Sequence, residues 1–185
     1  MPALATWAPE DGVLGAIAPL ALATTQPTAL VVDLDEAGPR YPSSRTLRQL
    51  VEDGPRAADL SPQQRGAAVL GNGGISYADS REMVDLLARG WPAVVLRLPP
   101  RAPDDVPAPL VPVRLLVPGR LFPTQGRGVY QPMGLPLKSR RRPRGTGSVI
   151  LPPAPRRAIA ALLEGGRPAR SRWLAAWRGI WTMQW

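Results

Sequence analysis

The sequence predicts an α/β fold: a small, doubly wound, mostly parallel sheet of about five strands in a Rossmann-like, three-layer arrangement, followed by a basic loop and a C-terminal helix. Three observations support this prediction. Strand-like and helix-like segments alternate through the first 100 residues. The run ALVVDL at 29–34 is apolar apart from Asp33, as strands buried on both faces are. The segment 79–90 repeats apolar residues at helical spacing, which is typical of a helix that covers such a sheet.

The individual elements of the first half follow from apolar runs and from the residues that interrupt them. Strands are expected at 4–7, 29–34, 67–70 and 93–98. The first helix is expected over 17–25, because Gln26-Pro27 ends it. A second helix is expected from a cap at Ser43 or Ser44 to an end at Gly54-Pro55, and a third from a cap at Asp79 or Ser80 to Gly90.

The second half is less regular. Proline is dense from 99 to 123, and Val111–Pro118 is expected to form an edge strand because of its prolines. Residues 156–163 predict a short helix, and Ser171 is expected to cap a last helix that runs to the C-terminus. The chain therefore divides into an α/β domain at 1–123, a basic Pro/Gly-rich loop at 124–148 and a helical segment at 149–185.

Composition excludes several kinds of site. With no cysteine and no histidine, the chain can form no disulfide, thiolate nucleophile, Cys/His zinc site or imidazole base. The opening MPALATWAPEDG lacks the basic start and apolar stretch of a secretory signal, and the apolar run 12–25 is too short to span a bilayer. We therefore expect a cytoplasmic protein that is not integral to a membrane.

Charge is distributed unevenly along the chain. Residues 1–100 carry 8 basic and 11 acidic side chains, whereas residues 101–185 carry 15 basic and 3 acidic ones. Such asymmetry indicates that the second half meets an anionic partner, such as nucleic acid, lipid headgroups or an acidic protein.

Three segments of the first half follow the order and spacing of a known family. They are APEDGVLGAIAPLALA at 8–23, ALVVDLDE at 29–36 and GWPAVVLRLPP at 90–100. They resemble, in turn, the phosphate loop with its helix, the aspartate-bearing strand and a later strand of the MinD/ParA/CpaE group of P-loop ATPases. The resemblance covers about half of the chain, and it implies the nucleotide-binding α/β fold of that group.

The resemblance also implies that the residues which hold the nucleotide are changed. A phosphate loop needs glycines around the phosphates, a lysine on the outer phosphates and a Ser/Thr hydroxyl on magnesium. On the family pattern, the signature lysine falls at Glu10, the phosphate lysine at Gly15, the magnesium hydroxyl at Ala16 and a metal-organising aspartate at Arg97. No lysine occurs in residues 1–137, so no small realignment restores the loop. We therefore expect no ATP hydrolysis and no cofactor.

Gly12, Asp33 and Asp35 keep family positions and are candidates for a relic nucleotide-binding or switch site. The alternative is that both aspartates are ordinary strand-end acids or helix caps. An enzyme that used them with a metal would need a further converging acid, and the sequence offers none that is well placed. The run GNGG at 71–74 fits either a phosphate cradle or a glycine-rich turn that leaves a strand.

The run KSRRRPR at 138–144 is the densest group of cations in the chain. Its candidate anion-binding residues are Lys138, Arg140, Arg141, Arg142 and Arg144. They could contact phosphate groups without sequence preference, or they could form a solvated loop. No aromatic residue interrupts the run, so base stacking is not indicated.

Four tryptophans recur at four-residue spacing near the C-terminus, at Trp173, Trp177, Trp181 and Trp185. On a helix they form one slowly drifting stripe, with arginines on either side of it. Three interpretations remain open: the stripe closes the core of its own domain, docks into a groove on a partner, or lies at a membrane surface. The last would make the protein peripheral to a membrane, as the C-terminal targeting helix does in MinD-type proteins.

Together these observations predict a non-catalytic MinD/ParA-like adaptor or positioning protein. The family resemblance suggests a role in cell division, chromosome segregation or the localisation of pilus or secretion machinery, with an intact ATPase relative or a second copy of the chain as partner. The alternative is a basic module that binds nucleic acid or a membrane surface. The first predicts contacts that salt hardly affects, and the second predicts binding that falls steeply with salt.

Overall fold

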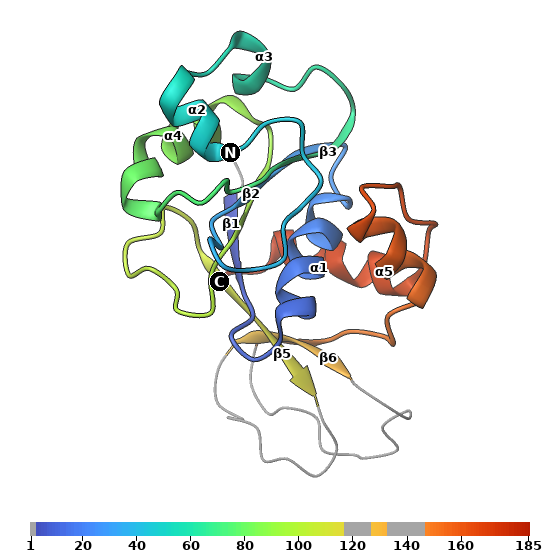
Figure 1. Ribbon diagram of the computed structural model, residues 1–185. Helices are drawn as coiled ribbons and strands as arrows, with labels where there is room; N and C mark the ends of the chain where they lie inside the picture. The colour runs from blue at the N-terminus through green and yellow to red at the C-terminus, as the bar shows by residue number, and fades with distance from the viewer. Residues whose placement is uncertain (1–2, 117–126, 133–146) are drawn as a thin grey trace.

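The computed structural model describes residues 3–116, 127–132 and 147–185, and within them seven strands form one all-parallel sheet in the order β3-β2-β4-β1-β5-β6-β7 (Figure 1). The strands are β1 (Ala3–Trp7), β2 (Thr28–Asp33), β3 (Gly66–Leu70), β4 (Val94–Arg97), β5 (Leu110–Leu116), β6 (Gly128–Pro132) and β7 (Ser148–Ile150). The helices are α1 (Gly12–Ala23), α2 (Leu47–Asp53), α3 (Ala57–Leu60), α4 (Tyr77–Gly90), α5 (Arg156–Leu163) and α6 (Arg172–Arg178), with a 3-10 turn at Gly179–Thr182. The predicted α/β class with a parallel sheet is confirmed.

Two apolar layers cover the two faces of the sheet. On one face, buried side chains of α1, α5 and α6 pack together, including Leu22, Leu162 and Trp177. On the other face, α2 and α4 contribute Leu50 and Leu87. The result is the three-layer arrangement that the sequence predicts.

Helix α1 begins five residues earlier than expected. The Asp11 side chain accepts the N–H of Leu14 at 2.6 Å and so caps the helix before the apolar run starts. From Leu14 onward the helix is almost wholly buried against the sheet, and it ends at Ala23. The segment that the family resemblance assigns to the phosphate loop therefore includes the first turn of a buried helix.

The second half adds more of the sheet than expected. Strand β5 is not an edge strand, because it pairs with β1 through Pro112 and with β6 from Val113 onward. Proline is tolerated at 112 because the pairing with β6 starts only after it. Strand β6 lies inside the predicted loop 124–148 and β7 begins at its last residue, so that segment contributes to the sheet of the first half.

The parallel register decides what meets at the carboxyl edge of the sheet. Strands β1, β2 and β4 are neighbours, and Arg97 of β4 is level with Thr6 of β1 and Asp33 of β2. Ligands of open α/β sheets bind outside this edge of the strands, so the candidate site is sought there. Within the described residues, no helix is long and apolar enough to cross a membrane.

Candidate functional site

The candidate site is an ion-pair cluster at the carboxyl ends of β2 and β4. Arg97 Nη1 donates to the Asp33 carboxylate at 3.2 Å, and Nη2 donates to the Asp35 carboxylate at 2.8 Å. The side chains of Arg97, Asp33 and Asp35 are 1%, 3% and 9% exposed. One guanidinium therefore balances part of the charge of two buried carboxylates, in the low-dielectric setting where such pairing matters most.

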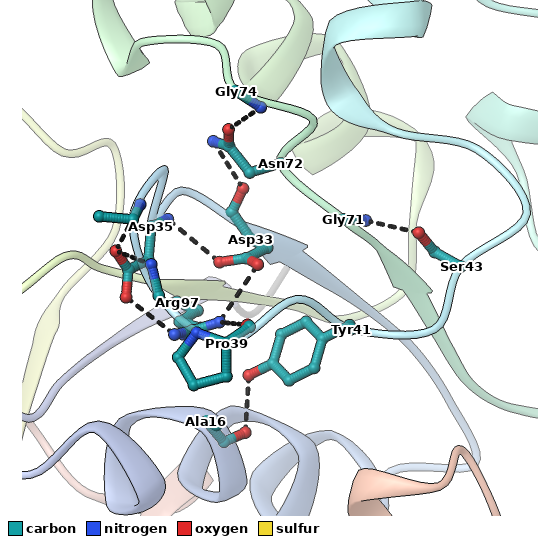
Figure 2. A network of polar contacts seen from close by, with 12 residues as sticks. Ala16, Asp33, Asp35, Pro39, Tyr41, Ser43, Gly71, Asn72, Gly74 and Arg97 are labelled. Atoms are coloured by element: carbon teal, nitrogen blue, oxygen red, sulfur yellow. Dashed lines mark hydrogen bonds and ion pairs between the residues drawn. The ribbon is translucent and has the colours of Figure 1, made fainter.

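Further groups hold the Arg97 guanidinium in place (Figure 2). Nη1 also donates to the Pro39 carbonyl at 2.7 Å, and the guanidinium carbon lies 5.1 Å from the centre of the Tyr41 ring. The Tyr41 hydroxyl donates to the Ala16 carbonyl of α1 at 2.6 Å. Tyr41 thus gives Arg97 a cation–π contact and ties the cluster to the helix. Arg97 Nε has no hydrogen-bond partner among the described residues.

Gly38 makes room for this arrangement. A Cβ atom at this position would lie 2.1 Å from both Arg97 Nη2 and an Asp35 carboxylate oxygen. Any side chain at 38 would therefore displace the ion pair. The Asp35 carboxylate also accepts the N–H groups of Ala37 and Gly38, so the turn after β2 wraps around the pair.

Burial raises the pKa of Asp33 to about 6, and the nearby Arg97 charge offsets only part of that effect. The cluster holds two carboxylates and one guanidinium, so it carries one excess negative charge when both acids are ionised. A proton on Asp33 would leave a neutral pair of Arg97 with Asp35. Burial also raises the pKa of Tyr41 above its ordinary value, so this hydroxyl remains a hydrogen-bond donor.

The start of α1 is occupied by the protein's own acids. The Asp11 carboxylate caps the helix, and this is the end where a P-loop protein would hold phosphates. Glu10 pairs with Arg114 of β5, whose Nε donates to the Glu10 carboxylate at 2.8 Å. Gly12 is the first residue of the helix and is exposed, with open space around its Cα.

These residues do not fit a magnesium nucleotide. Gly15 and Ala16 lie within α1 and offer neither a cation nor a hydroxyl. Asp11 places negative charge where the phosphates would lie, and Arg97 places positive charge between the two aspartates that would approach a metal. Among the described residues, no group of three or more acidic side chains could hold a metal ion. In the structure Asp33 and Asp35 form an ion pair with Arg97 and Gly12 begins α1, and the relic-site interpretation of these three residues stays a prediction.

The GNGG run at 71–74 forms a turn whose polar groups are used internally. The Asn72 side-chain oxygen accepts the N–H groups of Gly74 and Ile75, and its amide nitrogen donates to the Asp33 and Ile75 carbonyls. Gly73 and Gly74 have φ values of 81° and 83°, which glycine adopts without strain. The turn interpretation therefore agrees with the structure, and the same asparagine joins this turn to the end of β2.

Two of the four tryptophans, Trp173 and Trp177, lie in the protein's own core, and Trp181 and Trp185 are partly buried against it. Trp173 and Trp177 are buried with their rings edge to face at 5.9 Å, and Trp173 Nε1 donates to the Gln131 side chain of β6 at 2.7 Å. Trp181 Nε1 donates to the Leu22 carbonyl of α1, and Trp185 Nε1 donates to the Ile180 carbonyl. Trp173 and Trp177 are therefore not exposed to a partner or membrane, whereas the assignment of Trp181 and Trp185 to such a contact stays a prediction. The helix also ends at Arg178 rather than at the C-terminus.

The run KSRRRPR at 138–144, with Lys138, Arg140, Arg141, Arg142 and Arg144, lies outside the described residues. The basic character of the second half is nevertheless visible in the last helical segment. Six arginines there are exposed, and none forms an ion pair with a described residue: Arg156, Arg157, Arg167, Arg170, Arg172 and Arg178.

Sequence reasoning identified the positions of Asp33, Asp35 and Arg97 but not their contact, and it missed Gly38 and Tyr41. Arg97 was the available signal for this contact. The family resemblance places an aspartate at its position, and a cation at the end of that strand can pair with the aspartates of the neighbouring strand. No comparable signal marks Tyr41, whose contacts with Arg97 and Ala16 are long-range.

Comparison with known proteins assigns no family. No protein-family model matches the sequence, and no curated protein or solved structure matches it either.

Proposed function

We propose that this protein is a non-catalytic, MinD/ParA-like adaptor or positioning protein. The observation that carries the proposal is the contact of Arg97 with both Asp33 and Asp35. In the resembling ATPases, acids at these strand ends face magnesium and phosphate. Here the same edge of the sheet holds its own cation, which supports a site converted from ligand binding to structural support.

The chemistry of phosphoryl transfer supports the same conclusion. Catalysis in P-loop ATPases depends on positioned positive charge and a metal around the transferred phosphate. The start of α1 instead presents the carboxylates of Glu10 and Asp11, of which Glu10 pairs with Arg114 and Asp11 caps the helix. A triphosphate brought to this turn would meet like charge and would have to displace the N-cap.

The proposed role is to bind and position another protein. By resemblance, the setting is cell division, chromosome segregation or the localisation of pilus or secretion machinery. The partner is an intact ATPase relative or a second copy of this chain. The buried tryptophans do not supply the contact surface for this role, so another surface must do so.

Calorimetric titration with Mg-ATP and with Mg-ADP tests the proposal. We expect no saturable heat at millimolar nucleotide, whereas an intact MinD-type ATPase titrated in parallel should bind. We also expect the midpoint of thermal unfolding to be unchanged by nucleotide, because a ligand that binds the folded state would raise it. Tight, magnesium-dependent binding, or phosphate release above the rate of buffer alone, would overturn the proposal.

The exposed arginines of the last helical segment favour a second candidate function, a basic module that binds a polyanion. Six exposed arginines there, among them Arg156, Arg167 and Arg178, form no ion pair with a described residue. The inward tryptophans weigh against insertion into a membrane, since the segment offers few large apolar side chains to lipid. Binding to a random-sequence DNA duplex that falls steeply between 50 and 200 mM salt would support this function, by roughly the counterion-release law. Pelleting with anionic liposomes would support the membrane version.

A further inference from the structure

One edge of the sheet ends in β3, and its outward peptide groups face no strand within the described residues. In a parallel ladder, alternate residues of a strand bond to opposite sides. Gly66 donates its N–H to the Pro27 carbonyl, so Gly66, Ala68 and Leu70 bond toward β2. The N–H and C=O groups of Ala67 and Val69 therefore point away from the sheet.

The chain itself begins to use this edge and then leaves it. Thr46 forms a parallel bridge with Gly71, just beyond the end of β3, and Leu47 donates its N–H to the Gly71 carbonyl at 2.7 Å. The backbone then turns into α2, which Thr46 caps. Pairing on the outer side of this edge is thus compatible with the fold. It occurs only at Gly71 among the described residues, and the preceding outward-facing residues Ala67 and Val69 have no such strand beside them.

A cavity of about 400 Å³ lies beside β3. The five residues of β3 form one wall. Further lining residues come from α2, α3 and the segment before β3, and they include Leu50, Ala58 and Gln63. Leu87 and Trp91 add apolar lining. A segment lying along β3 would direct alternate side chains into this space.

Arg45 supplies a polar group to the cavity. Its Nη1 pairs with the Asp59 carboxylate. Its Nη2 forms a longer ion pair with the Asp53 carboxylate at 3.7 Å, and it is enclosed with no hydrogen-bond partner among the described residues. A buried donor without a partner is costly, so a ligand oxygen at this point would be stabilised.

We propose that the outer edge of β3 binds an extended segment of a partner protein as an added parallel or antiparallel strand, with an acidic side chain of that segment bonded to Arg45 Nη2. Main-chain bonds to Ala67 and Val69 supply affinity, and the cavity supplies selectivity for apolar and acidic side chains. The inference rests on the proposed adaptor role and names the kind of partner contact that the role requires.

The composition of β3 supports strand addition. Natural edge strands usually carry lysine, proline or other charged residues that prevent pairing with another chain. The sequence of β3 is GAAVL, which has none of these, and the Ala67 side chain is exposed and small enough for close approach. Arg45, Asp59 and Arg65 line the cavity, and Asp59 pairs with Arg45. Arg65, which forms no ion pair with a described residue, is the cation that favours an acidic over a basic segment.

The test is a selection of random dodecapeptides displayed on phage, with the wild-type protein as bait and the Ala67→Pro variant for counter-selection. Proline at 67 removes an outward N–H while the inward bonds of β3 remain, so the fold should survive. We expect the selected peptides to have β-branched residues at alternate positions and to contain an acidic residue. They should bind Ala67→Pro at least about tenfold more weakly, and the control Arg48→Gln, on the exposed side of α2, as tightly as wild type.

Amide hydrogen exchange makes the test independent of how well Ala67→Pro folds. A bound peptide should slow exchange at the amides of Ala67 and Val69 in the wild-type protein, and it should leave Ala68 nearly unchanged because that amide is already in the ladder. Arg45→Gln should weaken the preference for an acidic peptide. No peptide that discriminates wild type from Ala67→Pro, or peptide protection elsewhere than β3, would overturn the proposal.

Three further outcomes separate this proposal from its alternatives. If wild type is a dimer and Ala67→Pro a monomer by light scattering, the edge pairs with a second copy and the partner proposal is wrong. If Mg-ATP binds tightly but peptides still protect β3, the non-catalytic role fails and the edge site stands. If nucleotide does not bind and β3 selects no peptide, the adaptor role stands and the edge site fails.

Discussion

Removal of the Arg97 guanidinium should cost much more stability than the removal of an ordinary arginine. The Arg97→Ala variant leaves Asp33 and Asp35, 3% and 9% exposed, without their cation. Breaking a buried ion pair from one side costs about 3–5 kcal/mol, because a charge then remains buried and unpaired. For a chain of this length that corresponds to a fall of roughly 6–20 °C in the unfolding midpoint.

The comparison variant is Arg81→Ala, which removes an exposed arginine paired with Asp105. Exposed pairs contribute about 0–1 kcal/mol, so this variant should resemble wild type. Urea denaturation at pH 7.5, followed by circular dichroism, measures both. If Arg97→Ala unfolds before it can be measured, the triple variant Asp33→Asn, Asp35→Asn, Arg97→Met should restore a folded protein, because an uncharged replacement of a buried pair is often tolerated.

A loss within about 1 kcal/mol of that of Arg81→Ala would refute the reasoning, since it would mean that Arg97 is solvated or unpaired in solution. Failure of the triple variant to fold, with Arg97→Ala folded, would refute it as well. In that case the polar cluster would be needed for its hydrogen bonds rather than for the balance of charge.

Three more outcomes follow from the same structure. Because burial raises the pKa of Asp33 to about 6, folding takes up a proton between about pH 4 and 6. The free energy of unfolding, measured by urea titration, should therefore rise by up to about 3 kcal/mol as pH falls through that window. The Asp33→Asn variant should abolish this rise. Gly38→Ala should lower the unfolding midpoint, because the new Cβ would lie 2.1 Å from Arg97 Nη2 and from an Asp35 carboxylate oxygen. The backbone φ at this position does not require glycine, so a midpoint equal to that of wild type would contradict the described packing. Trp177→Ala should lower the free energy of unfolding by about 3–5 kcal/mol, and Trp185→Ala, at a partly exposed residue, by less, as measured by denaturation. Equal, small losses in both variants would mean that Trp177 is exposed in solution.

The sequence predicts the first half of the fold well because local patterns there agree with tertiary packing. The apolar runs around 29–34 and 93–98 become β2 and β4, buried on both faces, and the amphipathic run becomes α4. Helix boundaries shift where capping competes: Ser76, rather than Asp79 or Ser80, caps α4, and Thr46 caps α2. Several nearby residues could serve as caps, and the packing of the helix decides which one does.

The sequence predicts the second half less well because its strands are short and depend on their neighbours. Strand β6 contains Pro132, and β7 is three residues long, so neither shows a periodic pattern. Strand β6 is stabilised by pairing with β5, and β7 by pairing with β6. The tryptophan stripe is a related case: its spacing fixes one face of a helix, but only the position of α1 decides that this face turns inward.

The charged residues of the candidate site form a consistent set of contacts. Asp11 caps the start of α1, Arg114 pairs with Glu10, and Arg97 pairs with both Asp33 and Asp35. Each contact supplies from within the chain a charge or hydrogen bond that the group opposite it needs. Apart from Arg97 Nε, the cluster is held by the chain's own groups, so binding is expected elsewhere. Within the described chain, Arg45 Nη2 has no hydrogen-bond partner and the outer edge of β3 faces no further strand.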